Sequence, residues 1–162
     1  MTSGPLSTRL LTGAIAGVVA TAAMTAAVRR LHARLPPGER YPLPPREINE
    51  VLFDGSETGL RDATLATHFG FGAAAAALLT AARPRFGMAE GAAVGLLVWL
   101  SSYFGWVPAA GILRPASAHP ARRNLLMIGA HLLWGAVAAV TVSELRAARS
   151  GPFAGGPLRD RS

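Results

Sequence analysis

The stretch at residues 10–28, LLTGAIAGVVATAAMTAAV, contains no charged side chain over its 19 residues. A helix needs about 20 apolar residues to cross the hydrocarbon core of a bilayer, which is about 30 Å thick. A soluble helix of this length would present a polar face to water, and this stretch shows no such face. We therefore interpret it as a transmembrane span.

Three later segments have the same character. Residues 63–82 and 124–143 carry no charge, and residues 86–113 carry only Glu90. The sequence therefore predicts an all-α fold, a four-span transmembrane helix bundle that forms a single domain over residues 1–145. The spans are expected near residues 10–30, 63–82, 87–107 and 124–143. A Pro-rich loop is expected at residues 36–61, and a disordered tail at residues 146–162.

The composition narrows the class of partner and of chemistry. All basic residues are arginines, and the net charge is +7. They gather at span ends, as in membrane proteins, rather than in a stripe that would bind nucleic acid. The expected partner is therefore the lipid bilayer and not nucleic acid. The chain has no cysteine, no HExxH, no phosphate loop, no nucleophile elbow and no carboxylate pair within a span, so we expect neither a metal site nor catalytic residues.

The spans contain a pattern that suggests an internal repeat. Residues 68–76, HFGFGAAAA, align with residues 131–139, HLLWGAVAA. Residues 13–19, GAIAGVV, align with residues 91–97, GAAVGLL. We therefore predict two duplicated helical hairpins, related by a pseudo-two-fold axis along the membrane normal.

Four glycines in this pattern form small-xxx-small faces, which let helix backbones approach closely. They are Gly13 and Gly17 in the first span and Gly91 and Gly95 in the third. We expect these faces to bring spans one and three into tight contact. The alternative is that a chain so rich in Ala and Gly contains such spacings by chance.

The loop after the first span has a motif of its own: Pro42, Leu43, Pro44, Pro45, Arg46 and Glu47. The prolines predict extended backbone, followed by a short helix from Arg46 to Phe53 with Pro45 at its first position. Glu47 falls near the positive N-terminal end of that helix. We expect this segment to cap the bundle or to lie on the membrane surface.

A polar site is predicted inside the membrane. His68 and His131 lie one to two turns from the start of their spans, at similar depth, and Ser102 and Tyr103 approach the same level from the third span. Ionisable groups in a span tend to face the bundle interior. Three readings stay open: the histidines tie helices together by hydrogen bonds, they sense or relay protons, or they hold a haem as axial ligands.

The Pro-Leu-Pro-Pro-Arg motif, the His-led second span and the sequence AHLLW at residues 130–134 together resemble the YagU-like family of bacterial inner-membrane proteins. The resemblance implies a four-span protein with both termini in the cytoplasm and the Pro-rich loop in the periplasm. The arginine count leans the other way, with nine arginines on the loop side and seven on the side of the termini. The resemblance brings no enzymatic chemistry that maps onto these residues.

The leading functional hypothesis is a small, non-catalytic inner-membrane protein with no cofactor. It would act by helix association and by its loop cap, in the cell envelope or in stress response, and would bind a second copy of itself or another membrane protein. The first alternative is a proton- or small-solute-handling component that uses His68 and His131. The second alternative is a haem-binding redox protein.

Overall fold

The computed structural model describes residues 4–149 and Gly151, and this part of the chain is helical without strands. The elements are α1 (Leu6–His32), η1 (Pro37–Glu39), α2 (Pro44–Leu52), α3 (Glu57–Ala82), α4 (Met88–Leu100), η2 (Ser101–Trp106), α5 (Val107–Ala109), η3 (Ala116–Ala118) and α6 (Ala121–Ala148). α1, α3, the continuous run from α4 to α5, and α6 are each long and apolar enough to cross a membrane. The prediction of an all-α, four-span bundle is therefore confirmed, and the chain is a multi-pass membrane protein.

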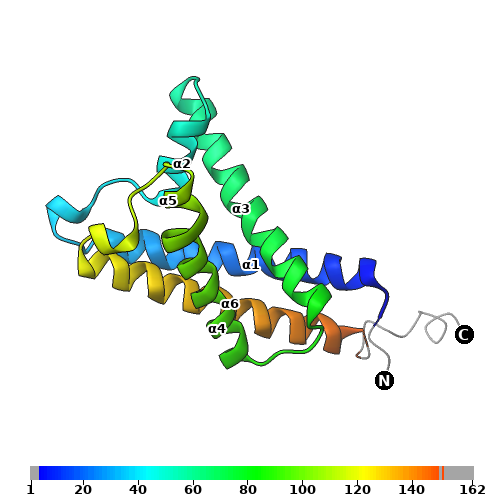
Figure 1. Ribbon diagram of the computed structural model, residues 1–162. Coiled ribbons are helices and arrows are strands. Elements are labelled where there is room, and N and C mark those ends of the chain that lie inside the picture. The colour runs from blue at the N-terminus through cyan, green and yellow to red at the C-terminus, as the bar shows by residue number, and fades with distance from the viewer. Residues whose placement is uncertain (1–3, 150, 152–162) are drawn as a thin grey trace, which may run out of the picture.

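The central pair of the bundle is α1 and α6, which lie side by side and run in opposite directions (Figure 1). α3 packs against α1, and α4 packs against α6. α3 and α4 make almost no contact with each other. Two helices thus flank a central pair and leave space between them.

The glycine faces pack span one against span two and span three against span four. A Cβ atom on Gly17 of α1 would overlap the carbonyl oxygen of Gly72 in α3, and a Cβ on Gly95 of α4 would overlap that of His131 in α6. The expectation that these faces bring spans one and three into tight contact was therefore wrong. A face of small residues shows where a helix can approach another closely. The partner helix must also carry small residues at the contact, as α3 does at Gly72 and α6 does at Gly135.

The two hairpins share this kind of contact but not its register. Gly17 faces the backbone at Gly72, whereas its counterpart Gly95 faces the backbone at His131. In the aligned sequences Gly72 corresponds to Gly135, four residues later. The contact points thus differ by about one helical turn, and the internal repeat stays a prediction.

Several boundaries differ from those expected. α3 begins at Glu57, six residues early, because the Ser56 hydroxyl accepts a hydrogen bond from the Gly59 amide at 3.2 Å and caps the helix. α2 begins at Pro44, since prolines fit the first turn, where no amide donor is needed. α6 continues through Ala148, so the start of the predicted disordered tail is helical. The rest of that tail, apart from Arg149 and Gly151, lies outside the described residues.

The third span changes geometry in its second half. After α4, η2 is a π-helical segment, and Gly105 within it leaves helical geometry with φ −107° and ψ −110°. π-Helical turns are frequent at functional sites because they re-aim side chains. Here the segment carries Ser102 and Tyr103, two residues of the predicted polar site.

Candidate functional site

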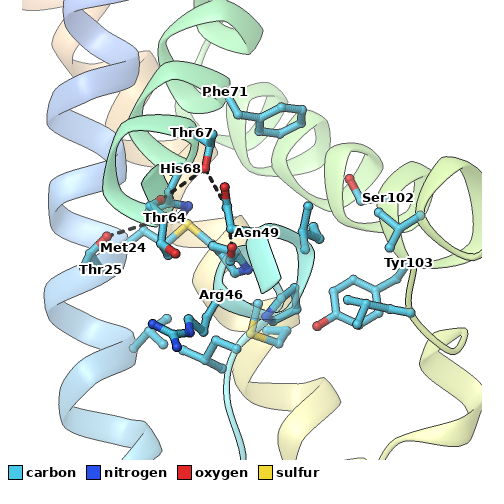
Figure 2. A pocket seen from close by; sticks show the side chains of 18 of the residues that line it. Met24, Thr25, Arg46, Asn49, Thr64, Thr67, His68, Phe71, Ser102 and Tyr103 are labelled. Atoms are coloured by element: carbon cyan, nitrogen blue, oxygen red, sulfur yellow. Dashed lines mark hydrogen bonds between the residues drawn. The ribbon is translucent and has the colours of Figure 1, made fainter. Parts of the chain in front are cut away.

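A cavity of about 720 Å³ lies in the loop-side half of the bundle, in the space between α3 and η2 (Figure 2). α1 and α6 also contribute to its wall, and α2 covers it. Most of its lining is apolar, with Met24, Val28, Ile48, Phe71 and Met127 among the contributors. Small-molecule sites in proteins have volumes of about 300–1,000 Å³ and mostly apolar walls. The size and lining of this cavity fit that class of site.

The structure brings the predicted polar residues together at this cavity. His68 of α3, His131 of α6, and Ser102 and Tyr103 of η2 all line it. Of the predicted loop motif, Leu43, Pro44, Pro45 and Arg46 line the same space, whereas Pro42 and Glu47 do not. The four glycines Gly13, Gly17, Gly91 and Gly95 do not line it and serve helix packing.

Each cavity histidine has one ring nitrogen engaged. The Thr25 hydroxyl donates to the Thr21 carbonyl at 2.7 Å, so it accepts from Nε2 of His68 at 3.2 Å. Nδ1 of His131 donates to the Met127 carbonyl at 2.8 Å. The second nitrogen of each neutral ring is then an unprotonated acceptor. Neither of these two acceptors has a partner within the described part of the chain.

Two buried polar atoms of cavity-lining residues also have no partner among the described residues: the Tyr103 hydroxyl and Oδ1 of Asn49. Asn49 is 1 % exposed, and its Nδ2 donates to the Pro45 carbonyl at 2.6 Å and to Oγ1 of Thr67 at 2.8 Å. Figure 2 shows the Asn49–Thr67 contact between α2 and α3. Buried polar groups are nearly always hydrogen-bonded, so this donor and this acceptor are candidate ligand contacts. Asn49 was not among the predicted site residues. The sequence feature that could have indicated it is a single amide side chain in a short helix whose other residues are apolar or charged.

Ion pairs hold α2 to the start of α3. The Arg46 guanidinium donates to both oxygens of Glu57, at 2.7 and 3.2 Å, and to Oε1 of Glu50 at 2.6 Å. Glu57 first, and then Glu50, raise the pKa of Arg46 above its usual value. The bidentate pair between Arg46 and Glu57 fixes the orientation of α2 relative to the start of α3. This contact gives a physical basis for the predicted role of the loop as a cap.

Arg123 anchors the segment that precedes α2. Its side chain is 1 % exposed, Nη1 donates to the Tyr41 carbonyl at 3.0 Å, and Nη2 donates to the Pro42 carbonyl. Tyr41 in turn contacts Nδ1 of His119 through its hydroxyl at 2.7 Å. Neither Arg123 nor His119 was among the predicted site residues. One feature of the sequence could have indicated a role for Arg123. A Pro-rich segment has backbone carbonyls but few amide donors, and an arginine side chain supplies five donors that can pair with such carbonyls.

Glu47 completes this anchor at some energetic cost. Its Oε2 lies 3.6 Å from Nη2 of Arg123 and has no hydrogen-bond partner among the described residues. Burial raises the pKa of the Glu47 carboxyl, and Arg123 and His119 offset this only in part. The loss of hydration therefore outweighs the attraction of this long ion pair.

Two basic residues on separate elements line the cavity, without a carboxylate among the described lining residues: Arg29 near the end of α1 and Arg114 in the loop after α5, and both are exposed. Neither side chain forms an ion pair within the described part of the chain. His32 also lines it, with Nε2 at 3.2 Å from the Tyr41 carbonyl. The cavity thus combines a mostly apolar lining with two unpaired arginines.

Among residues 4–149 and Gly151, no group of three or more His, Asp or Glu side chains could hold a metal ion. No protein-family model matches this chain, and no curated protein and no solved structure is significantly similar to it. The resemblance to the YagU-like family therefore stays a prediction from the motifs alone.

Proposed function

We propose that this protein is a non-catalytic membrane protein that binds an amphipathic small molecule in the α2-covered cavity. The observation that carries the proposal is the cavity of about 720 Å³ with a mostly apolar wall and two unpaired arginines in its lining. The proposal extends the hypothesis of a small-solute-handling protein. In it, the Pro-rich loop with α2 serves as the cover of the binding site.

The chemistry of the lining favours a ligand with an apolar chain and an acidic head group. Arg29 and Arg114 would bind the head group, since an unpaired guanidinium favours carboxylate or phosphate. The Tyr103 hydroxyl would add a donor to the head group or to ordered water beside it. Phe71 and Trp106 line the space from α3 and η2 and are 49 % and 46 % exposed. Because α3 and α4 scarcely touch, a chain could enter between them from the bilayer.

The test uses the full chain in lipid nanodiscs and a palmitic acid that carries a photoactivatable diazirine. We expect labelled peptides from α2 and the first half of α3, located by mass spectrometry. Thr64→Trp fills the cavity from α3 and should reduce labelling about tenfold, which corresponds to about 1.4 kcal/mol of binding. Leu78→Trp is the matched control, because Leu78 lies on the same helix, is 68 % exposed and does not line the cavity. Equal labelling of both variants would contradict the proposal.

A second candidate function is proton handling by His68 and His131. The observation that favours it is that both rings contribute to one cavity and each keeps an unprotonated nitrogen without a partner among the described residues. Histidine NMR titration in detergent tests this candidate, since an imidazole that relays protons must change charge between about pH 5 and 8. Two silent histidines over that range would exclude it.

The haem alternative rests on the same two rings. It requires both imidazoles to coordinate one iron from opposite sides of the macrocycle. A visible spectrum of protein purified from haem-supplemented cells tests it, because bis-imidazole haem gives an intense Soret band.

The cellular setting is part of the proposal. The resemblance in the Pro-Leu-Pro-Pro-Arg motif supports the bacterial inner membrane, with the termini in the cytoplasm and α2 in the periplasm, and a role in the envelope or in stress response. Fusion of a reporter active only in the cytoplasm to the C-terminus tests the orientation. Association with a second copy or with another membrane protein is tested by crosslinking in native membranes.

A further inference from the structure

A second hollow, of about 180 Å³, lies at the opposite end of the bundle from the α2-covered cavity. It is formed where α1 begins and where α3 and α6 end. Three arginines line it: Arg9 of α1, Arg146 of α6 and Arg149 directly after α6. No carboxylate contributes to the lining formed by the described residues. The hollow is therefore strongly basic and independent of the proposed ligand cavity.

Each arginine is held in place by a neutral acceptor. Arg9 donates to the Ala81 carbonyl at 2.8 Å, Arg149 donates to Oγ1 of Thr12 at 3.2 Å, and Arg146 donates to the Pro84 carbonyl. None of the three forms an ion pair with a described residue. Three uncompensated guanidinium groups around one small space repel one another, and a bound anion would relieve that repulsion.

Thr80 provides an independent observation. It lines the hollow and is 2 % exposed, yet its hydroxyl has no hydrogen-bond partner among the described residues. A threonine within a helix commonly donates to the carbonyl four residues earlier, as Thr12 and Thr141 do here. Nε of Arg9 is likewise buried without a described partner. Two buried donors at this site thus lack a hydrogen-bond partner among the described residues.

We propose that Arg9, Arg146, Arg149 and Thr80 form a binding site for a phosphate group. Guanidinium forks match the geometry of phosphate oxygens, and the Thr80 hydroxyl adds a neutral donor. The site lies at the ends of three spans, the level at which lipid head groups meet a bundle. Basic pockets between spans bind anionic head groups at this level. The phosphate group belongs either to an anionic phospholipid or to a free phosphate.

The experiment measures thermal unfolding of the full chain in phosphatidylcholine nanodiscs. One arm adds inorganic phosphate against sodium chloride of equal ionic strength, and the other replaces part of the lipid with phosphatidylglycerol. We expect at least one arm to raise Tm by about 3 °C. A rise with inorganic phosphate alone assigns the site to free phosphate, and a rise with phosphatidylglycerol assigns it to a lipid head group. No rise in either arm would overturn the proposal.

Variants separate this site from general charge attraction. Arg149→Gln and Thr80→Val should each weaken the apparent affinity about tenfold, because each removes a hydrogen bond to a charged group. Arg149 is exposed, so its variant tests the site without disturbing the bundle. Arg85→Gln is the matched control: Arg85 lies at the same end of the bundle, is exposed and does not line the hollow. An equal loss of affinity in Arg85→Gln and Arg149→Gln would also overturn the proposal.

Discussion

The guanidinium of Arg123 lies over the ring of Tyr41, with Cζ 3.7 Å from the ring centroid. The same group donates to the carbonyls of Tyr41 and Pro42. A residue at the start of α6 therefore holds the backbone that leads into α2. The cover of the cavity depends on a contact between segments that are 82 positions apart in sequence.

Replacement of Arg123 by Ala should loosen α2. It leaves two carbonyls unpaired and Glu47 without its counter-charge, and breaking a buried charge pair costs about 3–5 kcal/mol. We expect faster hydrogen exchange across residues 41–52 and a lower Tm. Arg122→Ala is the control, because Arg122 is an exposed neighbour with no described side-chain partner. Matching exchange in the two variants would show that Arg123 does not anchor this segment.

Glu47→Gln should change how stability depends on pH. Burial raises the pKa of the Glu47 carboxyl above 4.5, while Arg123 and His119 lower it and Glu50 raises it slightly. The folded state then binds the proton more tightly than the unfolded state. The contribution of Glu47 to stability is therefore greatest below pH 4.5 and declines as the pH rises through the raised pKa.

Glutamine carries no charge at any pH and lacks this decline. The difference in Tm between Glu47→Gln and the unchanged protein should thus move in favour of the variant as the pH rises from 4 through the raised pKa. Asp62→Asn, which changes an exposed carboxylate outside this contact, should show no such trend relative to the unchanged protein. A difference that stays constant with pH for Glu47→Gln would refute this account.

Gly95→Ala should destabilise the hairpin of α4 and α6. Even a methyl group at this position overlaps the carbonyl oxygen of His131, and overpacking costs about 1–3 kcal/mol. Gly129→Ala is the control within α6, since a Cβ there meets no atom within 4 Å. That control should be neutral or stabilised by up to about 1 kcal/mol. Thermal unfolding in detergent compares the two, and similar Tm values would contradict the tight contact.

The four spans were predictable because absence of charge over about 20 residues is a local property of the sequence. The contacts between the helices could not be predicted from such a local property. Gly13 and Gly17 form a small face in either arrangement, and the choice of α3 as partner depends on small residues located far along the chain. The start of α3 was placed too late because the absence of charge marks the apolar span, whereas the helix itself begins six residues earlier, after the Ser56 cap.

The candidate site was predictable in its intramembrane part and not in its cover. His68, His131, Ser102 and Tyr103 were grouped by depth, which follows from their distance to span ends. The burial of Arg123 and the position of Asn49 come from contacts between α2, α3 and α6 that no local pattern encodes. Apart from Gly105, the sequence of η2 contains no feature that indicates a π-helical turn.

Tyr103→Phe should separate ligand binding from stability. The Tyr103 hydroxyl is buried without a described partner, and the ring packs against Trp99 with centroids 5.7 Å apart. Phenylalanine keeps the ring contact and removes the unpaired hydroxyl, so the ligand-free protein should gain about 1–3 kcal/mol of stability. Photolabelling by the diazirine palmitic acid should fall in the same variant, because a hydrogen bond to the head group or to ordered water beside it is lost.

Thr141→Val provides the control, because the Thr141 hydroxyl already donates to the Val137 carbonyl at 2.8 Å and lies outside the cavity. It should leave labelling unchanged and bring no comparable gain in stability. Opposite changes in Tm and labelling for Tyr103→Phe indicate a polar group kept for a ligand, since a purely structural hydroxyl would lose stability when removed. A lower Tm together with unchanged labelling would assign Tyr103 to packing and remove it from the site.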